Sequence, residues 1–581
     1  MKRILSMLLV AIMLVSTLVI FTACGEPKDD GAEISVYLGD EVFDFDPTDY
    51  YVDSNAEQVM SLIYEPLFKI NKKGELKGAA AKEYSVDEEE RQITINLRES
   101  YWSDEIRVKA IDFIYAWRDI ILEPNNQNPA AALFYDIENA VQIKNGEESV
   151  YSFGAVASGT YEITITYREG ADYKQLLKNL ASVATSPLRE DIVSVAKTHW
   201  SKSVTSIVTN GPFKIESLSH ELGEFSLARN LGYHQKPTAK DYTDKVNPAS
   251  LISFFAENGK LELTYADIAD KTVFYMGNAT LEDRKSNEKK ATVADDYSTY
   301  TYVFNTENPL FADKNVRKAL SLALNREAIA EAVTFGNAAT GFLPNAVAKS
   351  VYGKKIDSRI ALEAAMEEAK SLLNGANLGS KSFTLTINDD EQSIAIAELA
   401  KAAWQELGFK VTIKKIGTVS TVIRDSSTAE DITILDSGIQ ALVKGAASGN
   451  ADFDVIAVDW QMYSNDAFVA LCAFTSHMNG NGQNFATGEF NKNISGWTNP
   501  DYDSYMNVAY SATSAADRKA ALAEAEKILL DSCPVIPVLY NESFAFISKD
   551  LSKISTDAFG NFVFTDAKQK NYTKYLESDE D

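Results

Sequence analysis

The side chains that most often carry enzyme chemistry are sparse in this sequence and are not spaced as active-site motifs require. We find no Gly-x-x-x-x-Gly-Lys-Ser/Thr phosphate loop, no dinucleotide-binding glycine fingerprint and no Gly-x-Ser-x-Gly nucleophile elbow. No zinc-binding His-Glu-x-x-His helix occurs, and no metal-binding spacing links the histidines, which are His199, His220, His234 and His477. The sequence therefore predicts no catalytic residue, no metal ligand and no cofactor.

Two features leave other chemistry open. Carboxylates are abundant, and a glycosidase would need two of them about 5–10 Å apart, which a linear sequence does not show. The segment 479–484, Asn-Gly-Asn-Gly-Gln-Asn, offers oxygen atoms of the kind that bind calcium, although a flexible loop has the same composition. We expect a plain loop there and keep an extracellular hydrolase as an alternative function.

The N-terminal segment has the pattern of an export signal. A short basic start is followed by an uninterrupted run of 18 apolar and small residues, Ile4 to Phe21. Such a pattern is typical of a secretory signal, although an uncleaved membrane anchor would look similar. The segment Phe21-Thr22-Ala23-Cys24 resembles a bacterial lipobox, with Phe21 where leucine is usual. This resemblance implies that residues 1–23 are removed, that Cys24 carries the lipid (palmitate among its chains), and that residues 24–33 form a tether.

The composition excludes several classes of protein. The net charge is −27, from 56 basic and 83 acidic residues, so the chain lacks the basic face that nucleic acid or an anionic membrane surface would attract. With 581 residues, of which 45% are apolar, it is long enough for about three to four globular domains. Cys472 and Cys533 both stand in apolar stretches, and we expect them to be buried thiols rather than a disulfide.

The hydrophobic pattern alternates between strand and helix periods, which predicts a mixed α/β protein. Apolar and polar residues alternate at 93–97, as in a half-buried strand. Apolar residues recur every three or four positions at 110–121, as in an amphipathic helix. We expect further helices at 361–373 and from Ser514 to about Leu530, the latter with a capping-box-like start.

One segment predicts a complete supersecondary unit. A strand is expected at 383–387, a helix at 391–407 with a stop at Gly408, and a second strand at 409–413. A strand, helix and strand in this order form a parallel pair with a right-handed crossover. At least the C-terminal half of the chain is therefore expected to contain an α/β domain.

Six segments together carry a resemblance that none of them carries alone. They are Tyr64-Glu65-Pro66-Leu67-Phe68 with Ala79 to Tyr84; Ala110-Ile111-Asp112-Phe113 with Trp117; Asn210-Gly211-Pro212-Phe213-Lys214; Phe304-Asn305-Thr306 with Val316 to Leu320; Trp497 to Asp503; and Ala525 to Leu529 with Pro534-Val535-Ile536-Pro537. In this order they resemble the family 5 solute-binding proteins of ABC importers, the oligopeptide- and dipeptide-binding group, over residues 34–548. The second segment is the strongest match, and we expect Phe113 and Trp117 to pack in the core.

This resemblance implies an α/β fold, a two-lobed clamshell of the periplasmic-binding-protein type with an extra third domain. Two hinge strands, near Phe304 and near Pro537 to Tyr540, would join the lobes. Carried onto this chain, lobe I comprises 34–56, 188–304 and 538–581, the extra domain comprises 57–187, and lobe II comprises 305–537. The lobes would close over the ligand, and ligand contacts made only in the shut form would stabilise that form.

The resemblance also implies that a peptide is recognised between the lobes, mainly through its backbone. In many relatives the aspartate of a Trp-x-x-Asp segment receives the peptide amine. The matching segment here has Trp460, but Tyr463 stands at the aspartate position. We expect Trp460 and Tyr463 to line the cleft, with a packed loop aromatic as the alternative for Tyr463. Asp466 is the candidate amine acceptor, or alternatively a helix N-cap, and Asp459 could also substitute.

Four further tyrosines are expected near the cleft. Tyr302 and Tyr540 stand beside the expected hinge strands. Tyr50 and Tyr51 follow Phe45-Asp46-Pro47, a segment that resembles the family's Leu-Asp-Pro turn near the pocket. For Tyr50 and Tyr51 the alternative is an ordinary surface position.

The function implied by the resemblance is that of a receptor and not of an enzyme. The chain would be a monomer, lipid-anchored on the outward face of the cell membrane, that binds an oligopeptide and delivers it to ABC permease subunits. Tyr463 leaves a second interpretation open, in which the same scaffold binds a sugar or a metal chelate, or senses a signalling peptide. A structural or adhesive protein is disfavoured because the sequence has no internal repeat. We expect a cell envelope without an outer membrane, where an anchor retains the receptor.

Overall fold

The computed structural model describes residues 31–570, apart from positions 40, 50–53, 197–198, 221–222, 255–271, 278, 375, 377, 425–430 and 485–486. The predicted signal segment, Cys24, Tyr50 and Tyr51 lie outside the described residues. None of the helices within the described part is both long and apolar enough to cross a bilayer.

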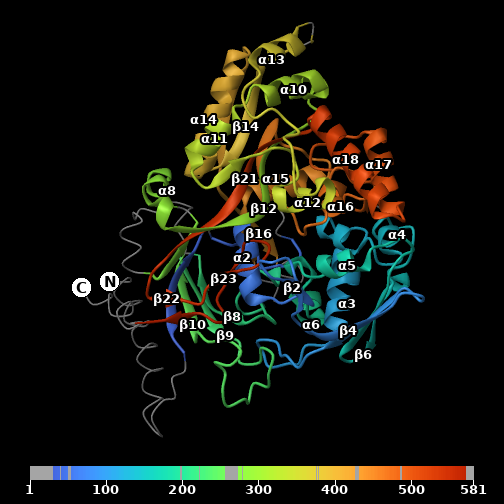
Figure 1. The fold of residues 1–581 in the computed structure, drawn as a ribbon, viewed down its shortest axis with the longest axis vertical. Helices are drawn as coiled ribbons and strands as arrows, with labels where there is room; N and C mark the ends of the chain where they lie inside the picture. Colours follow the sequence, from blue (N-terminus) through green and yellow to red (C-terminus); the bar gives the residue numbers. More distant parts are fainter. Residues whose placement is uncertain are drawn as a thin grey trace.

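One long mixed sheet runs through the molecule from bottom to top in Figure 1. Its strands follow one another in the order β15 (Lys410–Ile416), β14 (Ser382–Asn388), β18 (Val455–Gln461), β12 (Ala291–Phe304), β21 (Val535–Ile547), β11 (Phe274–Met276), β1 (Glu33–Leu38), β10 (Ser250–Phe254), β9 (Glu224–Arg229) and β8 (Phe213–Ser219). The short strand β13 (Gly336–Ala338) pairs with β21 beside this path. We call the part built on β1 and β8 to β11 the lower lobe, and the part built on β14, β15 and β18 the upper lobe.

Strands β12 and β21 are antiparallel to each other and connect the two lobes. The C-terminal part of β12 pairs with β18 in the upper lobe, and the end of β21 pairs with β11 in the lower lobe. Their mutual register shifts between Asp295 and Thr299 of β12. Because a register shift leaves residues unpaired and bends the strands, the connection changes direction where the lobes meet.

The upper lobe contains the predicted strand–helix–strand unit. Strands β14 and β15 are parallel, and α14 (Glu391–Glu406) joins them, which confirms the prediction. The indole of Trp404 on α14 donates to the Leu320 carbonyl at 2.9 Å and so fixes this helix against its neighbour. The other upper-lobe helices are α9 (Pro309–Ala312), α10 (Lys314–Leu322), α11 (Arg326–Val333), α12 (Asn345–Tyr352), α13 (Met366–Leu373), α15 (Gly438–Ala447), α16 (Ala467–Cys472), α17 (Pro500–Ser511) and α18 (Ala515–Ser532).

The prediction of a helix at 361–373 is wrong in its first turn, because α13 begins only at Met366. The preceding residues use their backbone groups elsewhere. The carbonyls of Ala361 and Leu362 accept from the guanidinium and the backbone N–H of Arg326. A buried arginine thus holds this stretch in a non-helical conformation, which the apolar period alone does not reveal. The helix predicted from Ser514 is confirmed as α18, with Ser514 as its N-cap.

A separate four-stranded sheet lies beside the lower lobe, with the order β4 (Ala81–Asp87), β5 (Gln92–Leu97), β7 (Glu162–Thr166) and β6 (Ala155–Gly159). The helix predicted at 110–121 is present as α3 (Ala110–Ile114), which continues as a wider π-helix, η2 (Tyr115–Ile121). Phe113 and Trp117 are fully buried, as predicted, and the Trp117 indole donates to the Thr185 carbonyl at 2.8 Å. The remaining helices of this region include η3 (Pro129–Phe134), α4 (Ala140–Lys144) and α5 (Tyr173–Asn179).

Glu65 is a buried carboxylate that ties together segments far apart in the lower lobe. The Tyr233 hydroxyl donates to its Oε1 at 2.5 Å, and Nε2 of His234 lies 2.6 Å from its Oε2. Burial on its own would raise the pKa of Glu65. The charges of His234 and Lys69 and the hydrogen bonds from His234 and Tyr233 outweigh burial, and the pKa of Glu65 is lowered.

Replacing Glu65 by glutamine is expected to lower the free energy of unfolding by about 1.5–3 kcal/mol at neutral pH, the range for hydrogen bonds to a charged group. The pKa of Glu65 is lower in the folded chain than its ordinary value of 4.5. Its stabilisation is therefore complete above that value and is lost as the pH falls through the folded-state pKa. Urea unfolding in neutral and in acidic buffer should show the loss shrinking in acid. The exposed Glu83→Gln variant is the control, and an equal loss at both pH values would contradict the charge argument.

Candidate ligand-binding cleft

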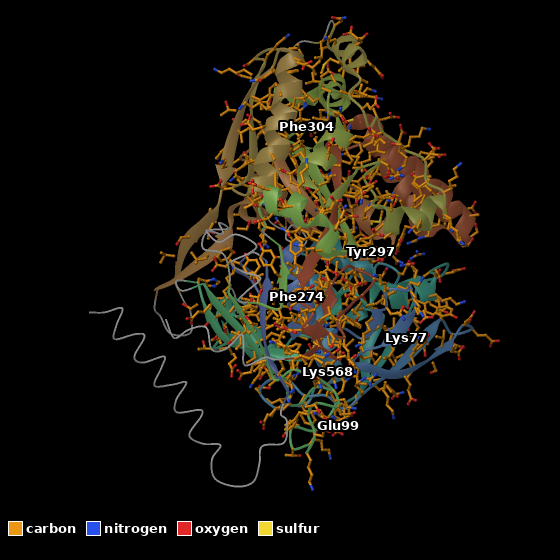
Figure 2. All side chains as sticks on the ribbon, turned by 60° about the vertical axis from the view of Figure 1, so that its left-hand side comes forward. Lys77, Glu99, Phe274, Tyr297, Phe304 and Lys568 are labelled. Carbon is orange, nitrogen blue, oxygen red and sulfur yellow. The ribbon has the colours of Figure 1, made fainter. Side chains whose placement is uncertain are left out.

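The end of β18 reaches the junction between the lobes. The segment after Gln461 leads into α16, and the Met462 N–H donates to the Tyr297 carbonyl of β12 at 2.8 Å. Figure 2 shows Tyr297 between Phe304 in the upper lobe and Phe274 in the lower lobe. The junction is therefore built from β12, β21 and the C-terminal end of β18.

One edge of β18 carries backbone groups that could pair with another chain. β18 pairs with β12 along its whole length, from Val455 to Gln461. On its other edge it pairs with β14 only at Val455 and Ile456. Within the described residues, no strand pairs with that edge from Ala457 to Gln461. An extended ligand could add to such an edge through its own N–H and C=O groups.

Trp460 occupies this edge segment, but its ring points into the upper lobe. The ring stacks on Phe474 with centroids 5.0 Å apart and meets Phe342 edge-on at 5.8 Å, and the residue is 5% exposed. Its backbone lies in the segment that could pair with a ligand, whereas its side chain supports that segment from behind. Direct contact between the Trp460 ring and a ligand stays a prediction.

Tyr463 and Asp466 lie between β18 and α16, and both are buried. Asp466 is the N-cap of α16, since its Oδ1 accepts from the Phe468 N–H at 3.0 Å. Its Oδ2 accepts from Nη2 of Arg518 at 3.0 Å. Both carboxylate oxygens thus have partners within the upper lobe, as the N-cap alternative predicts. The role of Asp466 as an amine acceptor and that of Tyr463 as a cleft residue stay predictions.

Tyr302 and Tyr540 stand on the two connecting strands, but their side chains pack inside the protein. Tyr302 is fully buried, with its ring edge-on to Trp404 at 5.4 Å. The Tyr540 hydroxyl donates to the Leu343 carbonyl at 2.8 Å and to the Gly341 carbonyl at 3.1 Å. Burial raises the pKa of both hydroxyls. These tyrosines stabilise the strands from the upper-lobe side, and the structure does not bring them together with Tyr463.

A group of acidic side chains at the junction is absent from the sequence-based prediction. Glu57 on α2 (Ser54–Ile63) of the lower lobe accepts a hydrogen bond from the Gln461 amide of β18. The same amide lies 3.5 Å from Oδ1 of Asp296 on β12, and Asn561 donates to both Glu57 and Asp557 at 3.3 Å. We call Glu57, Asp296 and Asp557 the junction acids. They come from segments far apart in the sequence, so no local pattern could have identified them.

Ion pairs that cross between the lobes were also not predicted. Lys202 of the lower lobe lies 3.4 Å from its neighbour Asp44 and also pairs with Asp436 on β17 (Asp431–Ser437), which precedes α15. Lys444 on α15 lies 2.5 Å from Asp49 of the lower lobe. Because these contacts form only while the lobes are together, they favour the closed arrangement.

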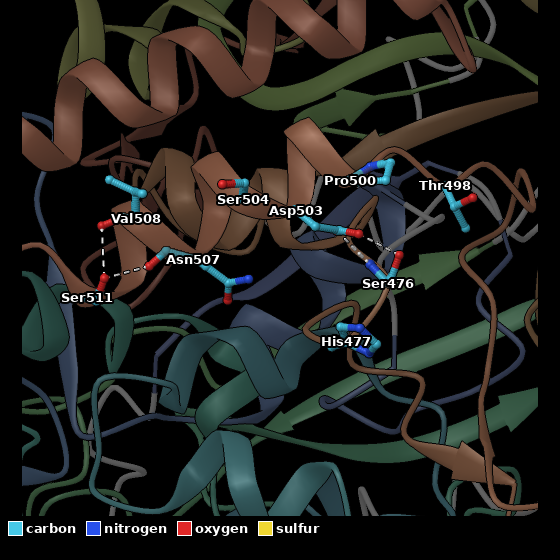
Figure 3. A pocket seen from close by; sticks show the side chains of 9 residues that line it. All are labelled: Ser476, His477, Thr498, Pro500, Asp503, Ser504, Asn507, Val508 and Ser511. Carbon is cyan, nitrogen blue, oxygen red and sulfur yellow. Dashed lines mark hydrogen bonds between the residues drawn. The ribbon is translucent and has the colours of Figure 1, made fainter.

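A hollow of about 620 Å³ lies along α17 of the upper lobe (Figure 3). It is lined by Ser476, His477, Thr498, Pro500, Asp503, Ser504, Asn507, Val508 and Ser511. Its one carboxylate, Asp503, accepts from the Ser476 N–H at 3.0 Å and from the Ser476 hydroxyl at 2.7 Å. Nearby, the side chains of Asn479 and Asn481 bond backbone carbonyls of their own loop, which favours the plain-loop interpretation of 479–484.

The chain matches the family model of the bacterial extracellular solute-binding proteins, family 5, over residues 75–482. The oligopeptide-binding protein OppA of Bacillus subtilis is 24% identical over 96% of this chain and 98% of its own length. A structure of Haemophilus influenzae OppA in complex with the peptide RPPGFSPFR superposes with a TM-score of 0.73 at 21% identity, over 94% of this chain and all of that one.

Structures of the Escherichia coli murein tripeptide-binding protein MppA give information on the arrangement of the lobes. One superposes with a TM-score of 0.73 at 22% identity, over 92% of this chain and 97% of that one. The unliganded open form of MppA gives only 0.51, at the same identity, over 90% and 95% of the two chains. The lobes of the present structure are therefore arranged differently from those of that open form.

The family match defines a substrate-binding protein of transporters rather than an enzyme, and the two-lobed α/β fold agrees with it. The chain belongs to family 5 of the bacterial extracellular solute-binding proteins. The family and the clamshell fold class predicted from the sequence are thus confirmed.

Proposed function

We propose that this protein is a lipid-anchored, outward-facing receptor that captures oligopeptides between its two lobes and delivers them to the permease of an ABC importer. The observation that carries the proposal is the edge of β18 from Ala457 to Gln461, at the junction of the lobes, along which no strand of the described residues pairs. An extended peptide can pair with such an edge whatever its side chains are. The relatives named as oligopeptide- and murein-peptide-binding proteins support a ligand of the same class.

Capture by closure requires that some contacts exist only when the lobes are shut. The pairs of Lys202 with Asp436 and of Lys444 with Asp49 are contacts of this kind. The Ser464 hydroxyl, which donates to Asn179 at 2.7 Å, links the upper lobe to α5 in the same way. In our proposal a bound peptide adds its own contacts to both lobes, and the permease then recognises the shut form.

The proposal includes the division of the chain given by the resemblance. Lobe I would comprise 34–56, 188–304 and 538–581, the extra domain 57–187, and lobe II 305–537. The register shift in β12 supports a hinge between the lobes. We also include the tyrosines at 50 and 51 as cleft residues, because Asp49 stands beside them and contacts Lys444 from across the junction.

Native mass spectrometry of residues 25–581, purified without added ligand, tests the peptide class directly. We expect extra masses that fragment into amino-acid residues, because closed lobes retain a ligand through purification. A single non-peptide mass would contradict the peptide proposal and favour the alternative of a sugar or a metal chelate on the same scaffold. For protein that carries no extra mass, binding of tri- to pentapeptides is measured by calorimetry, and failure of all of them would contradict the proposal.

The lipid anchor is tested by replacing Cys24 with serine. We expect the wild-type protein to partition into the detergent phase and to remain with cells, and the Cys24→Ser variant to appear in the aqueous phase, because one residue carries all the acyl chains. Substitution of Cys533, a buried thiol, by serine is the control for loss of a cysteine as such. Equal partitioning of wild type and Cys24→Ser would show that Cys24 is not the anchor.

A further inference from the structure

The junction acids have neutral hydrogen-bond donors but no cationic partner. The donors are the side-chain amides of Gln461 and Asn561, together with backbone N–H groups that bond Asp557. In the part of the chain that the structure describes, no lysine, arginine or histidine forms an ion pair with Glu57, Asp296 or Asp557. Burial raises the pKa of all three, to about 7 for Asp296 and about 6 for Asp557, and the neighbouring acids raise that of Glu57 further. The junction acids therefore have no compensating positive charge among the described residues.

The amide of Gln461 is a second, independent sign that a donor group belongs here. Gln461 is 3% exposed, and its nitrogen donates to the junction acids. Its carbonyl oxygen accepts no hydrogen bond from the residues that the structure describes, although it is buried. Asn541 on β21 donates to Asp459 of β18, and its Oδ1 has no donor among the described residues. Buried acceptors normally have partners, so this region offers more acceptors than the described part of the chain satisfies.

The placement of these groups couples them to closure. Glu57, where the proposed extra domain begins, packs with α2 against the lower lobe, to which Asp557 belongs, whereas Gln461 belongs to the upper lobe and Asp296 lies in the register shift between them. Asp296 and Asp557 remain half-buried, so they are accessible from the junction. Gln461 is also the last residue of the β18 edge along which no described strand pairs. A group bound among the junction acids would therefore touch both lobes at the end of the proposed ligand strand.

We propose that Glu57, Asp296 and Asp557, with the carbonyl of Gln461, bind a positively charged nitrogen group of the ligand, either an ammonium or a guanidinium. This inference rests on the proposed function, since it places the group at the end of a ligand held along β18. Several N–H donors on one cation match the several acceptors that the Gln461 and Asn561 amides link here, and charge-assisted hydrogen bonds are the stronger kind. A metal ion fits less well, because no His, Cys, Asp and Glu side chains of the described residues are grouped as metal ligands. The cation could be a peptide α-amine or a lysine or arginine side chain.

Matched peptides distinguish the two sources of the cation. Calorimetry would compare penta-alanine with N-acetyl-penta-alanine, and N-acetyl-Ala-Ala-Lys-Ala-Ala with its norleucine counterpart. We expect the charged member of one pair to bind more tightly to wild type. That preference should fall by at least about tenfold in Glu57→Gln and Asp296→Asn, the loss expected for hydrogen bonds to a charged group. Asp295→Asn is the matched control, because Asp295 is the exposed neighbour of Asp296 on the same strand.

The melting temperatures of the ligand-free proteins distinguish a binding role of the junction acids from a structural role, because the two roles predict changes of opposite sign. If the acids are held together for a cation, removing one charge should raise the melting temperature of ligand-free Glu57→Gln and reduce the rise caused by a charged peptide. A fall in melting temperature with unchanged preference for charged peptides would overturn the proposal. If no peptide binds wild type, the peptide function fails separately. Spermidine and agmatine are then the probes, and a wild-type thermal shift lost in Glu57→Gln supports the cation site, whereas no shift overturns it.

Discussion

Replacing Glu526 by alanine is expected to lower the free energy of unfolding by about 3–5 kcal/mol, the cost of breaking a buried ion pair. Glu526 on α18 is completely buried. Its Oε1 accepts from the N–H groups of Phe342 and Leu343 at 3.0 and 3.1 Å, and its Oε2 accepts from the Tyr352 hydroxyl at 2.6 Å. Nε of Arg359 lies 3.1 Å away. Without the carboxylate, two backbone donors and one guanidinium lose their buried acceptor.

The same substitution should weaken ligand binding, because Phe342 packs against Trp460 behind the β18 edge. Urea unfolding and peptide calorimetry would measure the two effects. Glu524→Ala on the same helix is the control, since Glu524 is half-exposed at the surface and pairs with the exposed Lys527, and such a surface change stays within about 0.5 kcal/mol. If Glu526→Ala unfolds at the same urea concentration as Glu524→Ala, the network around Glu526 does not hold the upper lobe together.

Reversing the charge of Lys444 should shift the protein toward the open form and weaken ligand binding by roughly 30-fold. Lys444→Glu removes the attraction to Asp49 and places like charges against each other across the junction. Asp44 and Asp46 stand near Asp49, and burial together with the charges of Asp44 and Asp49 raises the pKa of Asp46 to about 7. The glutamate of Lys444→Glu therefore adds a negative charge to a region that is already rich in acidic side chains. A like-charge contact of this kind costs several kcal/mol in a closed interface. When about 2 kcal/mol of this cost shifts the equilibrium between the open and closed forms, ligand binding weakens by roughly 30-fold.

Lys527→Glu is the control for Lys444→Glu, because it makes the same change of charge on the outside of α18. The radius of gyration of the ligand-free proteins, from small-angle X-ray scattering, would report closure without reference to any ligand. We expect a larger radius for Lys444→Glu alone, and a difference from wild type that shrinks in high salt. Equal radii and equal affinities in both variants would mean that the cross-lobe ion pairs do not influence closure.

Features with a local signature could be predicted from the sequence. The strand–helix–strand unit at β14, α14 and β15 follows from its hydrophobic periods, and the core positions of Phe113 and Trp117 follow from helical spacing. The order and spacing of six short segments were sufficient to predict the family and the clamshell fold. Helix boundaries do not follow from the sequence where a distant side chain binds the backbone, as the Arg326 guanidinium does before α13.

The site could be predicted only in outline, because its important contacts join residues far apart in the chain. The sequence places Trp460 in the right segment, but the direction of its ring depends on Phe474 and Phe342. The junction acids are a few among 83 acidic residues, and only the fold separates them from the rest. The sequence position of Asp466 is compatible with two roles, an amine acceptor and a helix N-cap. The distant Arg518 binds the carboxylate oxygen that the N-cap interaction leaves over.

The pairing of α2 with the C-terminal residues has a consequence for how the chain reaches this structure. Gln58 exchanges two hydrogen bonds with the backbone of Phe562, at 2.6 and 3.1 Å, across 504 positions. Strand β11 likewise has β21 as its partner, so part of the lower lobe is made from the last strands to be synthesised. Contacts of such sequence separation form slowly. In the proposed division of the chain the upper lobe, 305–537, is contiguous and can fold as soon as it emerges, whereas the N-terminal strands must wait, with exposed edges, for the end of the chain. A chain truncated before β21 should therefore retain a foldable upper lobe and lose the lower one.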